Sequence, residues 1–502
     1  MPSLVTWCCL APLVYVGIRA VQKLFTPGPF ENVPGPKPVS RLLGNLPQFF
    51  DQQGWEFQRD LSESYGRVVK LSMPFGAKWL FVFDPKALHE IVIKHQDVYE
   101  ETPIFRTGNA LILGQGLLAT IGDHHRQQRK MLNPSFAPGH LKEIFPLMLD
   151  VIHKLHQALS EQIAQDAPKE LDMLDWTTRT ALEAIGQCGL GYSFDPLTEH
   201  AQNPCGEAFK ALEPTIFPMH VMRILLPYIV KIGSAQFRRR LLEWTPYPRL
   251  QRVREIVDTM DATAKEILRV KRAALERGDE ELGRTVGQGK DILSTLHVQD
   301  KLREEITKMH AQLSQDGLDL TYDVLLGLPY LDAVCKETLR LFPAVPFIGR
   351  RTQEPITMRL SEPMTGVNGD AIDSIFIPVQ STVIIGIAAS NTDRAIWGDD
   401  AHEWKPERWM SADSCKTDSS GTKVPGVYNN MMTFLGGGRT CIGYKFAEME
   451  MKAILYTLLP SFRFDPPADK EICWNLAGIL YPTVGKTSKK VEMPLKITLI
   501  RP

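Results

Sequence analysis

The feature that most constrains the fold is a short stretch near the C-terminus, Phe434-Leu-Gly-Gly-Gly-Arg-Thr-Cys-Ile-Gly443. Its consecutive glycines free the backbone for conformations that a Cβ atom would forbid. Residues 444–451 follow with the spacing of an amphipathic helix, so Cys441 lies just before a helix N-terminus. The positive end of the helix macrodipole and the nearby cation Arg439 both favour the thiolate form of such a cysteine.

A thiolate held in an ordered turn of backbone N–H groups is what an axial sulfur ligand to haem iron requires. The alternative is a buried structural cysteine, which a lone Cys-Xaa-Gly would favour. Here the whole loop fits one pattern, and we interpret Cys441 as a metal ligand and the loop as cofactor-binding: Phe434, Gly437, Arg439, Cys441 and Gly443. This pattern resembles the haem-binding loop of the cytochromes P450, the haem-thiolate monooxygenases.

The resemblance covers the chain from about Pro34 to the C-terminus. It implies a mainly α (α+β) fold, a helical haem domain over residues 26–502 with a small β-sheet region. It also implies the activity: one oxygen atom from O2 is inserted into a small apolar substrate. Haem with an axial thiolate is the implied cofactor, and an NADPH-dependent reductase is the implied electron donor.

The composition limits the partners and the compartment. With 44% hydrophobic and 23% charged residues the chain is globular, and its formal net charge of -1 argues against a nucleic-acid partner. The 8 cysteines show no paired spacing, which predicts no disulfide framework and a body that faces a reducing compartment.

The N-terminus predicts a membrane anchor. Residues 4–18 are almost wholly apolar and are followed by Arg19 and Lys23. A cleaved signal peptide and a core helix are the alternatives, but no charge precedes the apolar run and no clear cleavage site ends it. Positive charge after the run favours a cytosolic body. We therefore expect residues 1–25 to anchor the protein in the endoplasmic reticulum membrane, with a proline-rich joint at residues 27–38.

Three further residues are candidates for pairing the haem propionates, which need cations if they are buried. His125 and Arg129 lie four apart on a predicted helix over residues 122–134, and therefore share a face. The family usually has Trp at the position of His125, and an imidazole can also donate. In the family an arginine of a later strand reaches a propionate, and the register favours Arg350 over Arg351. A solvated helix face and two exposed strand arginines are the alternatives.

Glu337 and Arg340 lie three apart on a predicted helix, and Arg408 belongs to a Pro-Glu-Arg segment. The family uses these three side chains as a buried structural cluster. We interpret them as supporting the fold rather than catalysis, and no catalytic residue is assigned.

The remaining patterns predict the secondary structure of several segments. Helices are expected over residues 56–65, 85–95 and 249–275 and from Val298 onward, with strands at 67–73 and 79–83. A long loop is expected at residues 104–116 and a final β-hairpin over residues 481–500. The apolar residues 216–232 fit either a buried helix–loop–helix or an edge that dips into a membrane.

One part that the family implies is missing. Its members carry a long apolar helix over the distal face of the haem, with an acid–alcohol step that admits oxygen and relays protons. Here a charged, glycine-rich linker at residues 278–290 leads almost directly into the helix near Val298, and Asp291, Ser294 and Thr295 do not form that step. A helix that crosses a haem needs about 20 residues. We therefore expect an internal deletion near residues 296–297, and this chain could be inactive. A haem-thiolate isomerase or dehydratase, or a non-catalytic haem-binding remnant, are the alternatives.

Overall fold

The computed structural model describes residues 29–163, 168–195, 197, 204–277, 296–410 and 423–500. The described residues form two compact units. The sheet unit takes its residues from Met1–Thr102, Phe342–His402 and Cys415–Thr440. The helical unit takes its residues from Pro103–Leu341, Glu403–Ser414 and Cys441–Pro502. The cysteine loop therefore begins in the sheet unit and ends in the helical unit.

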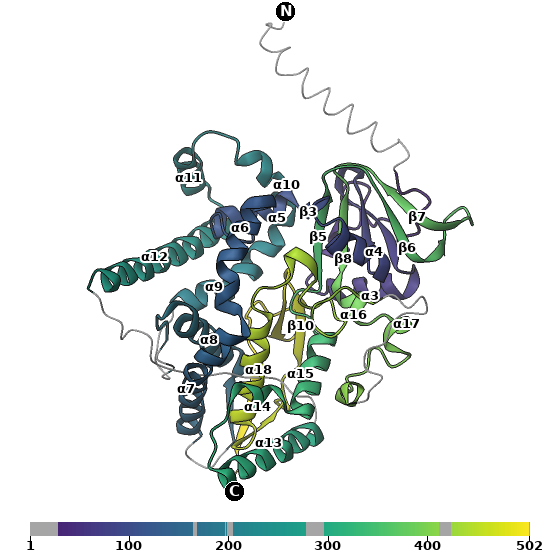
Figure 1. Ribbon diagram of the computed structural model, residues 1–502. Coiled ribbons are helices and arrows are strands. Elements are labelled where there is room, and N and C mark those ends of the chain that lie inside the picture. The colour runs from purple at the N-terminus through teal and green to yellow at the C-terminus, as the bar shows by residue number, and fades with distance from the viewer. Residues whose placement is uncertain are drawn as a thin grey trace, which may run out of the picture. The chain divides into compact units, whose positions relative to one another are not determined.

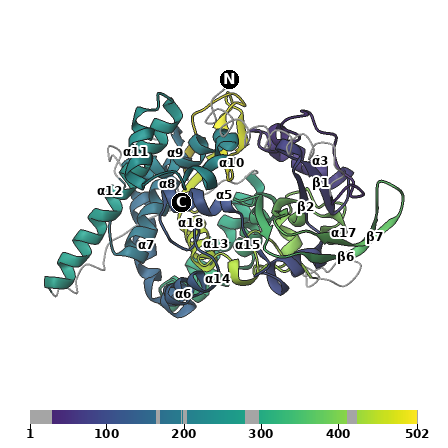
Figure 2. The ribbon, with the colours of Figure 1, turned by 90° about the horizontal axis from the view of Figure 1, so that it is seen from above.

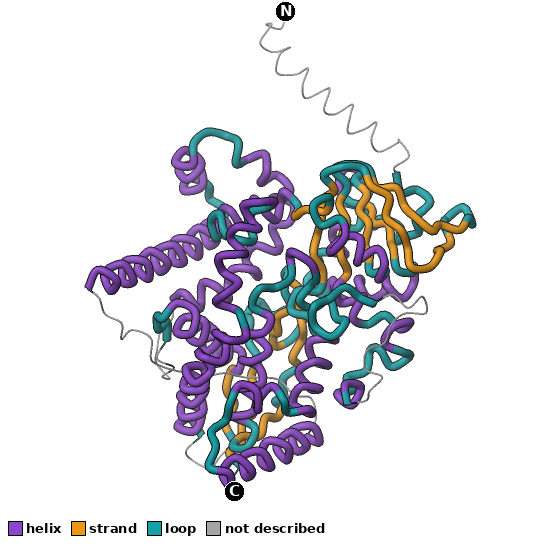
Figure 3. The backbone as a smooth tube through the Cα atoms, in the orientation of Figure 1, coloured by secondary structure: helices purple, strands orange, loops and turns teal. Residues whose placement is uncertain are grey.

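The sheet unit is built on a mixed five-stranded sheet in the order β1-β2-β8-β5-β3. Strands β2 and β8 pair in parallel, and the other neighbours are antiparallel. Strands β6 and β7 form a separate antiparallel pair (Figure 3). The elements of this unit are α2 (Leu46–Phe49), α3 (Gly54–Ser64), β1 (Val68–Ser72), η1 (Pro74–Gly76), β2 (Lys78–Val82), α4 (Pro85–His89), η2 (Glu90–Lys94), β3 (Tyr99–Glu101), β5 (Phe347–Thr352), β6 (Ile356–Thr365), β7 (Ala371–Ile377), β8 (Thr382–Gly386), α16 (Ile387–Asn391), α17 (Arg394–Trp397) and η7 (Gly437–Arg439).

Buried apolar side chains cover one face of this sheet. Leu71 and Phe81 from the sheet pack with Phe49 and Leu61 from α2 and α3, and all of them are fully buried. Such a face drives the small helices onto the sheet because it removes apolar surface from water.

The helical unit carries most of the helices, as Figures 1 and 2 show. Its elements are α5 (Pro103–Ile112), α6 (Gly122–Leu132), η3 (Asn133–Phe136), α7 (Pro138–Gln162), β4 (Lys169–Asp172), α8 (Met173–Ile185), η4 (Gly186–Leu190), α9 (Pro204–Ile216), η5 (Phe217–Met219), α10 (His220–Ile229), α11 (Ala235–Trp244), α12 (Pro248–Arg277), α13 (Leu296–Asp316), α14 (Tyr322–Leu326), α15 (Pro329–Leu341), η6 (Pro406–Trp409), α18 (Tyr444–Leu458), β9 (Phe462–Asp465), β10 (Ile472–Leu476), β11 (Leu480–Val484) and β12 (Pro494–Leu499).

The core of the helical unit lies where α7, α13, α15 and α18 meet. Leu155, Leu302, Leu331 and Met449 come from these four helices and are completely buried in one cluster. Apolar side chains recur every three or four residues along each helix, so each helix presents one buried stripe. The three-stranded sheet β4-β12-β9 packs its Ile497 into the same cluster.

Most of the expected elements are confirmed, and two expectations are wrong. The helices expected at residues 56–65 and 249–275 are α3 and α12, and the strands at 67–73 and 79–83 are β1 and β2. Residues 104–116 are not simply a loop, because α5 occupies Pro103–Ile112 and only Gly108 of the three glycines lies within it. The final hairpin is β10–β11, turned at Gly478 with a φ of +80°, whereas β12 pairs with β4 and β9.

Residues 216–232 contain α10, and its apolar side chains are not buried. Val221, Met222 and Leu225 are all exposed, which excludes the buried alternative for this helix. The expected anchor at residues 1–25 lies outside the described residues. Within the described ranges, no helix combines the length and the apolar character needed to cross a membrane.

Candidate functional site

The loop before the cysteine is locked by close backbone packing within the sheet unit. A Cβ atom on Gly436 would lie 1.9 Å from the carbonyl oxygen of Pro425, and one on Gly437 would lie 1.8 Å from that of Val92. Gly437 also has a φ of +66°, in the left-handed region that favours glycine. The glycines are therefore needed both for conformation and for space, and η7 is held against η2.

Polar contacts fix the same loop. The N–H of Gly438 donates to Oε1 of Gln96 at 2.7 Å, and Nη2 of Arg439 donates to Oε2 of Glu100 at 3.0 Å. The ring of Phe434 packs edge-on against Tyr428, with ring centroids 5.6 Å apart. A cation and a rigid turn thus immediately precede Cys441 in the chain.

Cys441 is the first residue of the loop that belongs to the helical unit. The residue is exposed, and α18 begins three residues later with Gly443 as its N-cap. Although the residue as a whole is accessible, burial of its thiol raises the pKa of Cys441, while the Gly443 N–H and the positive charge of Arg129 lower it. The expectation that the protein alone favours the thiolate is therefore wrong, because desolvation outweighs the loop and the cation. A coordinated metal ion would deprotonate the thiol.

Two of the expected propionate partners lie on α6 of the helical unit. His125 is buried and Arg129 is half-buried, four residues further along. The charge of Arg129 acts on Cys441, so the structure brings Arg129 and the cysteine into one electrostatic neighbourhood.

The third expected partner, Arg350, lies on β5 of the sheet unit. Its side chain is only 3% exposed, and its Nη1 donates to Oε2 of Glu101 at 3.0 Å and to the carbonyl of Gly349 at 3.1 Å. Its Nε and Nη2 groups donate to no other described residue. Arg351, the next residue of the strand, points to the opposite face and donates its Nε to Oε1 of Gln380. These contacts suit Arg350 rather than Arg351 as an anion ligand.

The sequence analysis did not find two acids, Glu100 and Glu101, which pair with Arg439 and Arg350. Glu100 and Glu101 are neighbours on β3, so their side chains point to opposite faces, one toward Arg439 and the other toward Arg350. The antiparallel register places Glu101 opposite Arg350. The only sequence signal was the Glu100-Glu101 pair itself, and only the strand pairing links it to an arginine.

The supporting cluster is present in the helical unit. Arg340 forms a bidentate pair with Glu337, with both N–O distances 2.8 Å, and Arg408 reaches Oε1 of Glu337 at 3.3 Å. Trp409 Nε1 and the N–H of Lys405 also donate to Glu337, at 3.0 Å each. Burial alone would raise the pKa of Glu337, but the hydrogen bonds and charge of Arg340 hold it below its usual value.

Within each unit, the residues described above suit a haem group. Cys441 is an accessible residue at the end of a rigid loop, and the charge of the half-buried Arg129 acts on its thiol. In the sheet unit, Arg350 is a buried cation with donors left unused, as a propionate would require. The mainly helical fold and this cysteine loop define a haem-thiolate protein.

Comparison with known proteins identifies the family. The sequence profile of the cytochrome P450 family matches residues 33–284 and 291–490. Cytochrome P450 monooxygenase 91 of Postia placenta is 44% identical over all of both chains, and monooxygenase 81 of the same fungus is 41% identical over 98% of this chain and 97% of its own. A ganoderic acid synthetase of Ganoderma lucidum is 35% identical over 97% of each chain. The chain belongs to the cytochrome P450 family, whose cofactor is haem iron with an axial thiolate.

The alignments with these relatives leave gaps in this chain. The alignment with monooxygenase 91 runs over 551 positions, whereas this chain has 502 residues, so at least 49 of those positions are gaps on its side. The family profile is itself interrupted between residues 284 and 291. The interruption coincides with the linker that precedes α13.

Proposed function

We propose that the haem iron is bound by Cys441 and that the ancestral activity of this chain is reductase-driven monooxygenation of a small apolar substrate. The observation that carries the proposal is the exposed Cys441, fixed between a glycine-locked turn and the start of α18. Haem, when bound, supplies the oxygen chemistry. The protein holds the sulfur in place, and a bound metal ion would favour the thiolate form that desolvation opposes.

The surrounding cations have a binding role in this proposal. Each unit by itself offers cations for pairing a propionate: His125 and Arg129 on α6 of the helical unit, and Arg350 and Arg439 in the sheet unit. Glu100 and Glu101 hold their two arginines in one rotamer, which reduces the entropy that anion binding costs. Phe434, Gly437 and Gly443 shape the loop around the sulfur.

We also propose that the protein acts at the endoplasmic reticulum membrane, with its body in the cytosol. The apolar residues 4–18 with trailing Arg19 and Lys23 support this. A second feature supports it independently of the N-terminus. α10 and α11 expose a set of large apolar side chains, here called the α10–α11 surface: Val221, Met222, Leu225, Tyr228, Ile229, Ile232, Phe237, Leu241 and Trp244.

Finally, we propose that the chain as written has little or no turnover. At least 49 aligned positions are absent, and the interruption of the family profile between residues 284 and 291 supports a loss in the interval that leads into α13. The family's oxygen-activating helix belongs in that interval. Within the described residues that flank it, α12 ends at Arg277 and α13 starts at Leu296.

The experiment compares two chains. One is the chain as written, and the other, the restored chain, carries the residues of monooxygenase 91 that align with the gap, inserted between Leu296 and His297. Both are reconstituted with haem and a reductase, and NADPH consumption is measured together with product formation. The restored chain should exceed the other by about 100-fold or more, because positioning of the reacting groups depends on the distal helix. Full NADPH-coupled turnover by the chain as written would overturn the proposal.

A further inference from the structure

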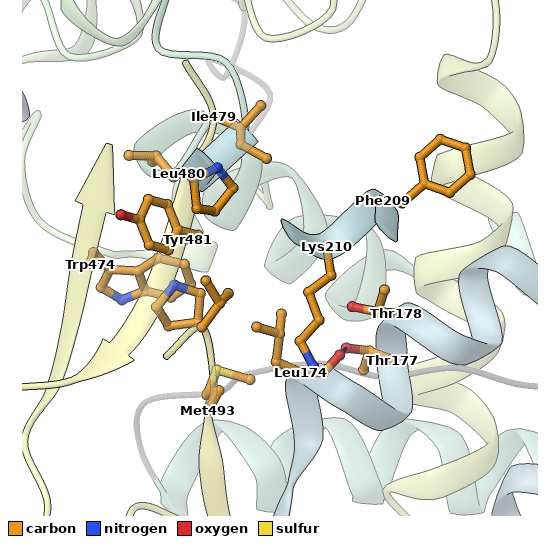
Figure 4. Close-up of a pocket in the computed structure, with 13 residues that line it drawn as sticks. Leu174, Thr177, Thr178, Phe209, Lys210, Trp474, Ile479, Leu480, Tyr481 and Met493 are labelled. Carbon is orange, nitrogen blue, oxygen red and sulfur yellow. Dashed lines mark hydrogen bonds between the residues drawn. The ribbon is translucent and has the colours of Figure 1, made fainter. Parts of the chain in front are cut away.

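The helical unit contains a cavity of about 470 Å³ between α8, α9 and the β10–β11 hairpin. Figure 4 shows Thr178 of α8 on one side of this space and Trp474 and Tyr481 of the hairpin on the other. The volume lies within the range of about 300–1,000 Å³ that is usual for small-molecule sites. Because protein interiors are close-packed, a space of this size between packed elements can hold a ligand.

The walls of the cavity are mainly apolar. Trp474 and Pro482 lie directly opposite each other in the register of β10 and β11, so both side chains are on one face of the hairpin. Leu174 of α8 and Phe209 of α9 line the cavity from the helices. Aromatic and aliphatic surfaces of this kind favour the transfer of an apolar molecule out of water.

Lys210 of α9 brings a positive charge to the cavity, and nearby acids neutralise it. Its ammonium group is 3.0 Å from Oδ1 of Asp175 and 3.6 Å from Oε1 of Glu207. Burial alone would lower the pKa of Lys210, but the hydrogen bond and charge of Asp175 raise it above its usual value. A ligand with a carboxylate would have to compete with these acids for the cation, so the cavity favours an uncharged ligand.

The hydroxyl group of Thr178 is available for a ligand. Thr177 and Thr180, on the same helix, donate to the carbonyl oxygens four residues earlier, at 2.8 and 2.7 Å, as threonines in helices often do. Thr178 donates to no residue that the structure describes, and Figure 4 shows its side chain at the wall of the cavity. A ligand oxygen could therefore accept a hydrogen bond from it.

We infer that this cavity binds an uncharged, mainly apolar small molecule that accepts a hydrogen bond from Thr178. A ketone, ester or alcohol oxygen on a ring system would accept from the hydroxyl, while the rings pack against Trp474. The inference goes beyond the proposed function, because none of these contacts involves Cys441 or a haem group. All the lining residues belong to the helical unit, so the chain as written would already bind such a molecule.

Three probes of one shape test the chemistry of the ligand. Benzophenone carries a carbonyl group, diphenylmethane has a methylene group in its place, and 4-benzoylbenzoate adds a carboxylate. Equilibrium dialysis against the chain as written measures each Kd. Benzophenone should bind one molecule per chain, and 4-benzoylbenzoate should bind at least about tenfold more weakly, because its charge loses water without gaining an unpaired cation. Equally tight binding of the carboxylate would overturn the uncharged class.

Substitutions at Thr178 test the site itself. Thr178→Val keeps the shape of the side chain and should weaken benzophenone binding about 3–10-fold, but diphenylmethane binding less than about twofold, because only the ketone accepts the hydrogen bond. Thr178→Phe fills the space and should abolish the binding of both probes. Thr307→Val and Thr307→Phe, at an exposed threonine of α13, are the matched controls and should leave both Kd values unchanged. Equal weakening of both probes by Thr178→Val, or binding that survives Thr178→Phe, would overturn the inference.

Photo-labelling locates the probe even if Thr178→Phe does not fold. Irradiated benzophenone inserts into nearby C–H bonds, and mass spectrometry of the peptides should find the label at residues that line the cavity, such as Leu174 and Met493. Label found only on other parts of the chain would show that the cavity does not bind the probe.

Cys441→Ala separates this inference from the proposed function. The Kd of this variant for benzophenone and its labelled positions should match those of the original chain. Loss of probe binding in Cys441→Ala would place the ligand at the haem and overturn the cavity site. A chain that binds the probe in the cavity but lacks the thiolate-type carbon monoxide spectrum keeps the cavity site and loses the proposed haem ligand.

Discussion

At the residue scale, the charges of the candidate site are balanced within each unit. Arg350 and Arg439 are each held by a neighbouring glutamate of β3, and Arg129 acts on Cys441. The surroundings of the thiol oppose its charged form, because burial raises the pKa of Cys441. A bound metal ion would supply the positive charge that stabilises the thiolate at such a site.

Replacing the thiol tests its assignment. Cys441→Ala should abolish the thiolate-type carbon monoxide spectrum of the reduced, haem-loaded protein, because no other sulfur would replace the ligand. The measurement is the difference spectrum of reduced protein with and without carbon monoxide, in both the chain as written and the restored chain. Cys473→Ala, at a buried cysteine of β10, is the control and should keep the spectrum. A Cys441→Ala variant that retains it would refute the ligand.

Glu450 on α18 allows a prediction about pH, because its Oε1 is enclosed and has no hydrogen-bond partner among the described residues. Burial raises the pKa of Glu450 to about 8, from an ordinary value of 4.5. The protonated form is thus favoured by the folded state, so its contribution to stability is present below pH 4.5 and is lost as the pH rises to about 8. Glu450→Gln should remove this loss and stabilise the protein at pH 8 by about 2–5 kcal/mol, with little effect near pH 4.5.

Urea unfolding at the two pH values measures this difference. Glu161→Gln, at an exposed acid of α7, is the control and should change neither curve. A Glu450→Gln variant with the same pH slope as the original would show that another group causes the loss.

The cations of the candidate site could be predicted from sequence, and their partners could not. Cys441 and Arg439 belong to one contiguous motif, so local spacing was sufficient to find them. Glu100 and Glu101 are far from Arg439 and Arg350 in sequence and meet them only through strand pairing and the packing of η7 on η2. The direction of the pKa shift of Cys441 could not be predicted from the sequence either, because desolvation depends on the atoms that the fold brings near the thiol.

At the scale of elements, periodicity predicted the long helices and failed where proline and glycine interrupt it. α12 and α13 carry regular apolar stripes, whereas α5 contains Gly108 and begins at Pro103, which together resemble a loop. Pro103 is tolerated because the first turn of a helix has no intrahelical use for its N–H. The hairpin β10–β11 was misplaced because β12, which follows it, is also an apolar strand but pairs elsewhere.

The contact between α15 and η6, which is made by the cluster around Glu337, can be tested by substitution. Glu337 has five donors around it from Arg340, Lys405, Arg408 and Trp409, and is completely buried. Arg340→Met should cost about 3–5 kcal/mol of unfolding free energy, because it leaves a buried carboxylate without its bidentate partner.

The measurement is urea unfolding at pH 7. Lys308→Met, which breaks an exposed ion pair with Glu304 on α13, is the matched control and should cost less than about 1 kcal/mol. Equal losses in the two variants would show that the cluster is no more than a surface pair.

At the scale of the whole molecule, the predicted membrane contact has two parts that can be separated. Residues 1–25 are expected to act as an anchor, whereas the α10–α11 surface would lie against the lipid without crossing it. A chain that begins at Pro27 should therefore lose resistance to carbonate extraction but still float with lipid vesicles. The full-length chain should need detergent for release.

Three substitutions on that surface, Leu225→Ser, Tyr228→Ser and Trp244→Ser, should then release the truncated chain, because each removes apolar area from the lipid interface. The measurement is flotation with vesicles of neutral phospholipid. Leu268→Ser, at an equally exposed leucine of α12, is the control and should leave binding unchanged. If the full-length chain is soluble without detergent, the anchor is wrong. If the truncated chain never binds vesicles, the α10–α11 surface has no lipid contact, and its exposed apolar side chains need another partner.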